Sequence, residues 1–465
     1  MKQIQLKVII AIFFALQING MYSKTAIRLN GSQENDLSFY RSVKYDDFAN
    51  RFGEVRWGVN SLTNLRLRTD IGDYVTFNLA VNINLLSGLF TDSYRALYLA
   101  QTGSQMLSVA NPDSIYNTYF GIPFDYKSTY IGGFELERVS FAAGNQFFNF
   151  EMGLIRLSRG FGYAFSPNDY FNPKNPYNQK ARPEGKLAAQ MTLYPKDMWK
   201  IQLFTVAPDN PLESRGWGIT TGASTMFSVS RFNFEFSYSL LLPEIEYDKD
   251  PKDFGLPETT RNDFSHIAGF SMKADIEIGF FIDAIYVFDH KVFKTGVMNG
   301  RTFNGYEGLQ AAIGIDYTLP GGKVYLLTEY LFYGPAALTF GESLNELYSG
   351  STSWDELSPV KRASLIDTER KIGTFLRHNY IFNMIRGKIN DYLSISGSLM
   401  FGADDLSAVG MISADIEPVQ AFTINVGFTS FIDKRLFGDL YEKGELGYSN
   451  TGMYNSVSVS TKIRF

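Results

Sequence analysis

Apolar and polar residues alternate with a period of two in many short segments of this chain. The last residues show it best, where Val457, Val459, Thr461, Ile463 and Phe465 alternate with Ser458, Ser460, Lys462 and Arg464. Successive side chains of a β-strand point to opposite faces, so the pattern predicts a strand with one face toward lipid and the other toward water. The same alternation of apolar and polar residues occurs over residues 75–85, 232–238, 393–399 and 422–429. No stretch approaches the ~20 apolar residues that a transmembrane helix needs.

The segments between these candidate strands alternate between short and long. Turn-forming residues occupy the short ones, at 70–73, 144–145, 195–197, 320–322, 390–391 and 417–419. The long ones are polar and cover residues 90–127, 159–184, 243–263, 337–372 and 433–452. This alternation is typical of a transmembrane antiparallel β-barrel with short periplasmic turns and long extracellular loops. We therefore predict an all-β fold in which residues 24–465 form a single barrel domain.

The number of strands follows from counting back from the carboxy terminus, which gives about seventeen. A barrel whose two chain ends share one side of the membrane needs an even number, so one further strand is expected within residues 24–48. We predict eighteen strands, with sixteen as the alternative. The alternative stays open because segments 130–142 and 146–158 change phase midway, at Arg138 and Ile155, as bulged strands do.

The composition agrees with a barrel. Phe (40), Tyr (28) and Gly (41) are abundant, while charged residues make up only 20% of the chain. Aromatic girdles, a polar lumen and Gly-containing strands account for these numbers without a second domain. The formal net charge of −5 is too small to indicate a nucleic-acid partner.

The amino terminus indicates export. Lys2 and Lys7 flank the start of a short apolar run over residues 8–16, and charge resumes only at Lys24. We predict a signal peptide over residues 1–23. The chain has no Cys, which excludes a disulfide framework and a lipid-anchored amino terminus. Together with the strand pattern, this predicts the outer membrane of a diderm bacterium.

Two features resemble known outer-membrane proteins. The carboxy-terminal Phe465 resembles the last residue of bacterial outer-membrane β-barrels, which implies an assembly signal read by the barrel-assembly machinery. The segment from Ile155 to Pro173 contains an Arg-bearing strand end, a Gly-aromatic pair and the run Phe-Ser-Pro-x-Asp-x-Phe-Asn-Pro. It resembles a signature of porin-like barrels akin to alginate-export proteins. The resemblance covers residues 130–205 and implies a barrel family rather than a substrate.

The same segment has the features of a loop that folds into the barrel. Ser166 and Asp169 are able to bond the nearby backbone and Pro167 and Pro173 restrict it, so the loop is expected to be stiff. The charged residues that such a loop brings to a constriction are Arg156, Arg159, Asp169 and Lys174.

The sequence leaves a second interpretation of this loop open. Phe165, Tyr170 and Phe171 are equally suited to pack an ordered outer loop against the barrel rim.

Strand phase also assigns charged side chains to the lumen. The basic ones are Arg56, Arg66, Arg68, Lys186, Lys200, Lys273, Arg377, Lys462 and Arg464. The acidic ones are Glu135, Glu137, Glu235, Asp275, Asp283, Asp316, Glu329, Asp415 and Glu417. From these we select Arg56, Arg66, Arg68, Glu235 and Arg377 as pore candidates, because a basic ladder opposite an acidic wall guides anions. The alternative is that the charges pair and only keep the wall wet and rigid.

The sequence gives little support for an enzymatic function. The chain has three His and no Cys, and it shows no spaced metal ligands, phosphate loop or calcium motif. We expect no catalytic residue, no metal and no cofactor.

Two classes of function stay open. The first is an outer-membrane channel for small hydrophilic solutes, with membrane lipid and the barrel-assembly machinery as partners. A variant of it is a transporter for apolar substrates of the fatty-acid type, which needs a plug and an apolar tunnel. The second class is a surface-exposed binding protein or adhesin that acts through its long loops. The sequence indicates neither the solute nor the oligomeric state.

Overall fold

The computed structural model describes most of the strands and short turns of the chain. The described residues are 25–42, 55–88, 109–110, 117–122, 130–172, 174, 176, 185–207, 219–242, 265–289, 297–298, 301–302, 305–334, 375, 377–432 and 453–465. The predicted signal peptide, residues 1–23, lies outside them. So do the predicted long loops, apart from two short strands within 90–127, the first part of 159–184 and single residues elsewhere.

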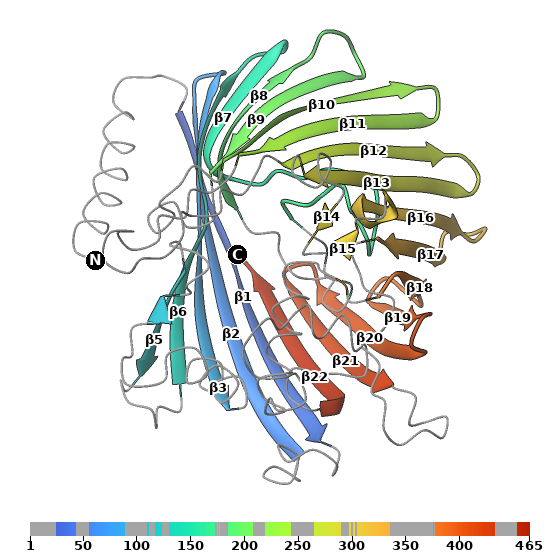
Figure 1. Ribbon diagram of the computed structural model, residues 1–465. Coiled ribbons are helices and arrows are strands. Elements are labelled where there is room, and N and C mark those ends of the chain that lie inside the picture. Colours follow the sequence, from blue (N-terminus) through green and yellow to red (C-terminus); the bar gives the residue numbers. More distant parts are fainter. Residues whose placement is uncertain are drawn as a thin grey trace, which may run out of the picture.

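Eighteen antiparallel strands close into one barrel (Figure 1). Each wall strand pairs with the next one along the chain, and the first strand pairs with the last. The wall strands are β1 (Thr25–Ser42), β2 (Val55–Ile71), β3 (Val75–Gly88), β6 (Tyr130–Gly144), β7 (Phe148–Ile155), β8 (Lys186–Leu193), β9 (Trp199–Val206), β10 (Thr220–Val229), β11 (Phe232–Leu241), β12 (Ser265–Asp275), β13 (Gly279–Asp289), β16 (Leu309–Thr318), β17 (Val324–Tyr333), β18 (Asn379–Lys388), β19 (Leu393–Gly402), β20 (Ser407–Val419), β21 (Phe422–Ile432) and β22 (Met453–Arg464). The predicted all-β barrel of eighteen strands is confirmed, and β1 is the strand expected within residues 24–48.

Smaller elements extend the wall or lie beside it. The short strands β4 (Val109–Ala110) and β5 (Asn117–Ile122) form a hairpin, and β5 pairs with the part of β6 that β7 does not reach. A separate two-stranded sheet consists of β14 (Val297–Met298) and β15 (Arg301–Thr302), followed by the 3₁₀ turn η1 (Gly305–Gly308). Within the described part of the chain, no helix is long and apolar enough to cross a membrane.

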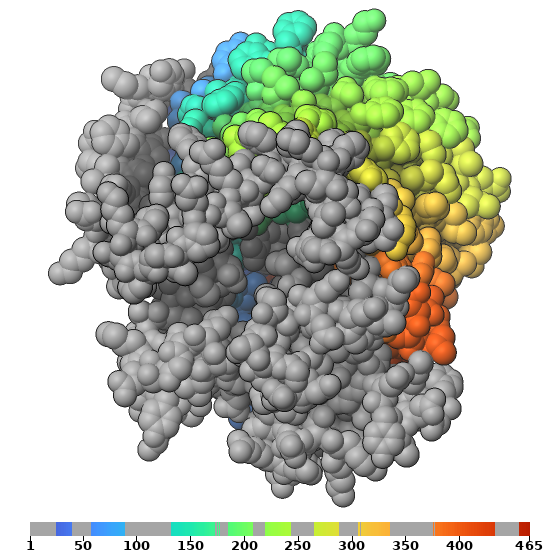
Figure 2. Space-filling model, in the orientation of Figure 1, coloured from blue at the N-terminus to red at the C-terminus, as the bar shows by residue number. Residues whose placement is uncertain are grey.

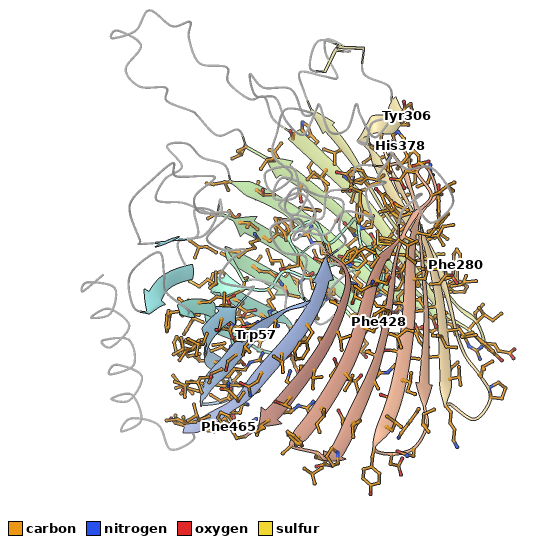
Figure 3. All side chains as sticks on the ribbon, turned by 90° about the horizontal axis from the view of Figure 1, so that it is seen from below. Trp57, Phe280, Tyr306, His378, Phe428 and Phe465 are labelled. Atoms are coloured by element: carbon orange, nitrogen blue, oxygen red, sulfur yellow. The ribbon has the colours of Figure 1, made fainter. Side chains whose placement is uncertain are left out.

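The two faces of the wall differ in exposure as the alternation predicts. On β11, Phe236 and Tyr238 are 45% and 46% exposed, whereas Glu235 and Ser237, which alternate with them, are buried. Apolar side chains cover the outside of the barrel, and Figure 3 labels two outward aromatic residues, Trp57 of β2 and Phe428 of β21. The space-filling view shows the strands from β7 to β18 as a continuous wall (Figure 2).

The two phase changes noticed in the sequence have different causes. The pairing of β3 with β6 shifts register because Ala80 lies opposite Arg138 while Val81 lies opposite Leu136. Glu137 is therefore the extra residue of a β-bulge, and its side chain is buried, at 4% exposed. At Ile155 the phase changes because β7 ends there and the chain leaves the wall.

Candidate functional site

The residues that follow β7 form the most unusual part of the barrel. Residues 156–172, which we call the inner segment, belong to no strand. In Figure 1 the teal chain after β7 enters the barrel interior and runs toward β13 and β16. Several of its side chains are almost inaccessible, among them Ala164 (1% exposed), Phe165 (2%) and Asn168 (0%). The inward arrangement, one of the two that the sequence left open, is the one that this structure has.

Three carboxylates on the inward faces of three strands meet the inner segment. They are Glu235 of β11, Asp283 of β13 and Glu329 of β17, and each is at most 1% exposed. On the same inward faces, their neighbours two residues away are mostly apolar and buried, such as Phe281 and Leu327. A lone carboxylate in such surroundings is costly unless donors surround it.

The donors are consecutive backbone N–H groups of the inner segment. Gly160 donates to Glu235 Oε2 at 2.9 Å, and Phe161 donates to Asp283 Oδ2 at 3.1 Å. Gly162 also donates to Asp283 Oδ2, at 3.5 Å. The N–H groups of residues 163, 164 and 165 all donate to Glu329, the last two at 2.6 and 2.9 Å. Six successive N–H groups thus share three carboxylates.

This arrangement satisfies both partners. A segment that leaves the sheet loses the strand neighbours that would accept its N–H groups, and buried N–H groups need acceptors. The carboxylates supply them, and hydrogen bonds to an ionised acceptor are stronger than those between neutral groups. The backbone turn needs Gly160, whose φ is +71° and whose missing Cβ would overlap Asp283 Oδ2.

Polar side chains of the inner segment add a second layer of bonds. Ser166 Oγ donates to Asp283 Oδ2 at 2.8 Å, and the Asn168 N–H donates to Asp283 Oδ1 at 2.8 Å. The Asn168 amide also donates to Ser271 Oγ (2.9 Å) and accepts from Ser237 Oγ (2.6 Å). Asp283 therefore accepts four hydrogen bonds from one segment, which fixes that segment's position in the lumen.

An apolar wall inside the barrel receives the aromatic residues of the segment. Phe165 packs edge-on against Phe375 and Phe382, with ring centroids 5.7 and 6.3 Å apart. The buried cluster to which they belong consists of Ala164, Phe165, Phe281, Ala312, Leu327, Leu331, Tyr333, Phe375, Tyr380, Phe382, Met384, Met400 and Val409. This half of the lumen is therefore not polar, which differs from the expectation of a lumen that is polar throughout.

Arg159 anchors the start of the inner segment through aromatic contacts. It forms no ion pair with any of the described residues. Its guanidinium lies 3.9 Å from the ring centroid of Phe204 and 5.3 Å from that of Phe171, and it donates to Tyr170 OH at 3.0 Å. The side chain is 5% exposed. Cation–π contacts of this kind strengthen when they are desolvated.

Asp169 lies buried in the same segment. Desolvation raises the pKa of its carboxyl from 3.8 to about 7, although the charge of Lys174 and hydrogen bonds from the Arg159 backbone and Ser158 act in the opposite direction. Its Oδ1 atom is buried and has no hydrogen-bond partner within the part of the chain that the structure describes. Lys174 Nζ itself donates to the carbonyl oxygen of Gly162.

The other half of the lumen is polar. Glu137, the bulge residue, accepts from the amide of Asn64 at 2.6 Å, from Arg66 at 3.4 Å and from Arg156. Asn64 also donates to Asn82 at 2.5 Å. This network joins β2, β3 and β6 to the start of the inner segment.

A cavity of about 490 Å³ lies at the short-turn end of the barrel, where the ends of strands β17 to β22 and Glu34 of β1 line it. Its charged lining residues are Glu34, Lys323, Arg386, Lys388, Asp391, Asp415, Glu417, Lys462 and Arg464. Ion pairs join Lys462 to Glu34 at 3.3 Å and Lys388 to Asp391 at 3.1 Å. Among the described residues, Lys323 and Arg386 form no ion pair, and the five basic and four acidic side chains of the lining leave the cavity with a net charge of +1.

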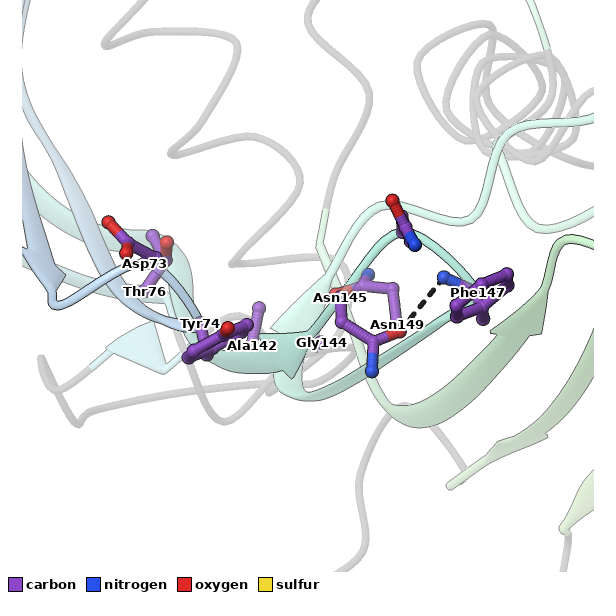
Figure 4. A pocket seen from close by; sticks show the side chains of 9 residues that line it. Asp73, Tyr74, Thr76, Ala142, Gly144, Asn145, Phe147 and Asn149 are labelled. Atoms are coloured by element: carbon purple, nitrogen blue, oxygen red, sulfur yellow. Dashed lines mark hydrogen bonds between the residues drawn. The ribbon is translucent and has the colours of Figure 1, made fainter.

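A second hollow, of about 640 Å³, lies between two short turns (Figure 4). Its lining comes from the β2–β3 turn and the β6–β7 turn, including Tyr74 and Asn145. Asn145 Oδ1 accepts from the N–H of Phe147 at 2.8 Å, which closes the second turn. This hollow is a gap between two tight turns that pack side by side, and we assign it no function.

The remaining pore candidates from the sequence lie in different places. Arg68 pairs with Asp70 at 2.9 Å on the same strand. Arg377 is buried at the long-loop end, 3.5 Å from Asp405. The side chain of Arg56 lies outside the described residues. The structure therefore brings Arg156, Arg159, Asp169, Lys174 and Glu235 together around the inner segment, and Arg66 joins them through Glu137.

Sequence reasoning placed Asp283 and Glu329 in the lumen but gave them no role. A usable signal was present, because each is an acid between inward-facing apolar residues on its strand, Phe281 and Ile285 for one and Leu327 and Leu331 for the other. An isolated carboxylate in an apolar inward row predicts a specific hydrogen-bonded partner.

No family model and no curated protein sequence matches this chain. Among solved structures, a mutant of the Rh. blastica porin has a TM-score of 0.40 at 10% identity, covering 95% of this chain and 100% of that one. OprB of Pseudomonas putida has a TM-score of 0.42 at 9% identity, covering 94% of each chain. Wzi of Escherichia coli, an outer-membrane protein involved in group 1 capsule assembly and a carbohydrate-binding β-barrel, has a TM-score of 0.47 at 11% identity, covering 93% of this chain and 84% of that one. These TM-scores are all below 0.5, so the assignment of the barrel fold is based on the strand pairing within this chain.

Proposed function

We propose that this protein is an outer-membrane channel for small hydrophilic solutes, and that the inner segment is its constriction. The observation that carries the proposal is the fixation of residues 156–172 across one half of the lumen by three strand carboxylates. The opposite half keeps polar and charged side chains around Glu137, and a charged cavity lies at the short-turn end of the barrel, so a hydrophilic solute has hydrogen-bonding partners along its path. The apolar outer face supports insertion into a membrane.

A substitution that adds one methyl group and displaces the inner segment tests whether this segment is the constriction. In Gly160→Ala the new Cβ overlaps Asp283 Oδ2 and lies 2.6 Å from Ser166 Oγ, so the segment has to move. Gly72→Ala is the matched control, because Gly72 has a similar φ of +63° but nothing within 4 Å of its Cβ position. The measurement is single-channel conductance of the reconstituted protein in a planar bilayer.

We expect stepwise currents in the wild type, larger or noisier currents in Gly160→Ala, and wild-type currents in Gly72→Ala. If Gly160→Ala fails to fold, Glu329→Gln tests the same point, because it removes the charge that three N–H groups share. Its control is Asp275→Asn, an inward carboxylate paired with Lys273 at 2.9 Å. An absence of current in every variant would contradict the channel.

A second candidate is a transporter for apolar substrates, because one half of the lumen is apolar. In this structure the inner segment covers that wall, with Phe165 buried among Phe375 and Phe382. Binding of a fluorescent fatty acid to wild type and Gly160→Ala separates the two functions. Saturable binding without conductance favours the apolar substrate.

The proposal includes three finer statements. The chain is related to alginate-export-type barrels through the segment from Ile155 to Pro173, Phe465 is its assembly signal, and it carries no catalytic site. For Phe465, the supporting geometry is a pair of backbone bonds with Gly31, at 2.7 and 3.0 Å, that lock the end of β22 to β1.

A further inference from the structure

Polar side chains occupy the outward face of β1 and β2 near the middle of the strands. They are Gln33 and Asn35 of β1 and Ser61 and Thr63 of β2, which we call the outer polar patch. The strand register places Gln33 opposite Thr63 and Asn35 opposite Ser61. On the other side of β1, Thr461 of β22 lies opposite Asn35 and extends the patch.

Exposure shows that the patch is on the outside. Leu29, Leu37 and Phe39 share its phase on β1 and are 74%, 36% and 39% exposed. Ser32 and Ser38 have the opposite phase and are 7% and 3% exposed. The patch therefore interrupts an apolar outer face.

The side chains of the patch bond mainly to one another. Gln33 Nε2 donates to Asn35 Oδ1 at 3.1 Å and to Ser61 Oγ at 2.7 Å. Ser61 Oγ donates to Asn35 Oδ1 at 2.7 Å, and Thr63 Oγ1 donates to Gln33 Oε1. Among the described residues, no acceptor faces the Asn35 amide nitrogen.

Such a patch is costly in lipid. Hydrocarbon offers no hydrogen-bond partner, so the two N–H groups of Asn35 would remain unsatisfied there. A partner that brings acceptors to this face removes that cost. Amide and hydroxyl side chains are at once donors and acceptors, so a second copy of the same patch is a complementary partner.

We propose that two copies of this chain pair within the membrane through the outer polar patch, around a two-fold axis near Asn35. A two-fold axis sets the same surface against itself, so each Asn35 amide faces the acceptors of the other patch. The surrounding apolar residues Leu37 and Leu65, each about a third exposed, form a rim that packs against the partner. The inference rests on the membrane insertion contained in the proposed function.

Other polar pairs on the outer face are smaller. Thr205 and Thr221 lie 3.3 Å apart and contribute two hydroxyls. Thr328 donates to Asn383 at 2.9 Å, which makes a pair with a single amide on the β17–β18 surface. This second pair serves as a matched control.

Cross-linking in vesicles tests the pairing, because the chain has no Cys of its own. Leu37→Cys, at the rim of the patch, and Asn383→Cys are purified, reconstituted into phospholipid vesicles, recovered by flotation and treated with a short bis-maleimide. We expect Leu37→Cys to give a product of twice the chain mass and Asn383→Cys to remain a single chain. Only a second copy can form this product in a purified sample.

A second pair of variants measures the energetic role of the patch. Gln33→Leu with Asn35→Leu is expected to shift the protein from dimer to monomer in mild detergent, by light scattering after size exclusion. Thr328→Val with Asn383→Leu is expected to stay dimeric. A monomeric wild type, or floating Leu37→Cys protein that does not cross-link, would overturn the pairing alone. Failure of every variant to float with vesicles would contradict the membrane insertion and the pairing together.

Discussion

At the scale of single residues, the lumen depends on a few groups whose surroundings change their chemistry. Asp169 is the clearest outside the strands, because burial raises the pKa of its carboxyl to about 7. The groups that act on this carboxyl are Lys174, Ser158, Asp283 and the backbone of Arg159. A carboxyl that prefers to be protonated in the folded state makes the position of its segment depend on pH.

We expect the inner segment to be held less firmly above pH 7 than at pH 5.5. The folded state binds the proton of Asp169 more tightly than the unfolded chain does, so its stability falls as pH rises from about 4 to about 7. Hydrogen exchange of residues 156–172, corrected for intrinsic rates, is the measurement. Asp169→Asn should remove most of the difference between the two pH values, and Asp391→Asn, in an exposed turn, should leave it unchanged. An equal pH effect in wild type and Asp169→Asn would contradict the assignment.

At the scale of elements, the β-bulge in β6 joins the wall to the inner segment. The extra residue Glu137 is 4% exposed and accepts from Asn64, Arg66 and Arg156. Removing one partner of a buried ion pair leaves the other partner's charge uncompensated. The bulge is therefore a structural requirement of the site and not an irregularity of the strand.

Glu137→Gln should destabilise the barrel by about 3 kcal/mol or more, because it leaves the Arg156 charge unpaired in a largely buried place. Asp391→Asn breaks the exposed pair of Lys388 and Asp391, 3.1 Å apart, and should cost at most about 1 kcal/mol. Urea unfolding of the two variants in vesicles, followed by tryptophan fluorescence, gives both values. Equal effects would mean that Glu137 is no more important than a surface pair.

At the scale of the whole molecule, the barrel has two unlike halves. Strands β13 and β16 to β20 present an apolar inner wall under the inner segment, whereas β1 to β3 and β6 carry the polar network around Glu137. At the short-turn end, the charges of the cavity do not cancel, because five basic and four acidic side chains line it and Lys323 and Arg386 form no ion pair among the described residues. In the proposed channel, the uncompensated charge is positive.

The channel should therefore prefer anions. Replacing both Lys323 and Arg386 with Gln should lower the permeability of chloride relative to potassium by about twofold per charge, the size expected from about 0.5 kcal/mol of Coulomb energy in a water-like medium. The reversal potential in a potassium chloride gradient measures this ratio. Lys196→Gln, in the turn between β8 and β9, should leave it unchanged. A cation preference in the wild type would contradict the role of these two residues.

The periodic pattern of the sequence was sufficient for the wall of the barrel. The alternation seen at Val457 and Ser458 depends only on the geometry of an extended chain, so it reports which face of each strand is apolar without knowledge of its neighbours. The strand count followed from the same periodicity and from the need for both ends to lie on one side. The same alternation also predicted that the side chains of Asp283 and Glu329 point into the lumen.

Only the tertiary structure shows which groups those carboxylates bind, namely the backbone N–H groups of the inner segment. The bond from Gly160 to Glu235 spans 75 residues of sequence, and the bond from Ala164 to Glu329 spans 165. Contacts of this range depend on how the closed sheet brings β11, β13 and β17 around one lumen, which no local pattern encodes. The sequence by itself determined the wall and the orientation of its side chains, because these follow from neighbouring residues. The tertiary structure decided that residues 156–172 cross the lumen, because their acceptors come from three distant strands.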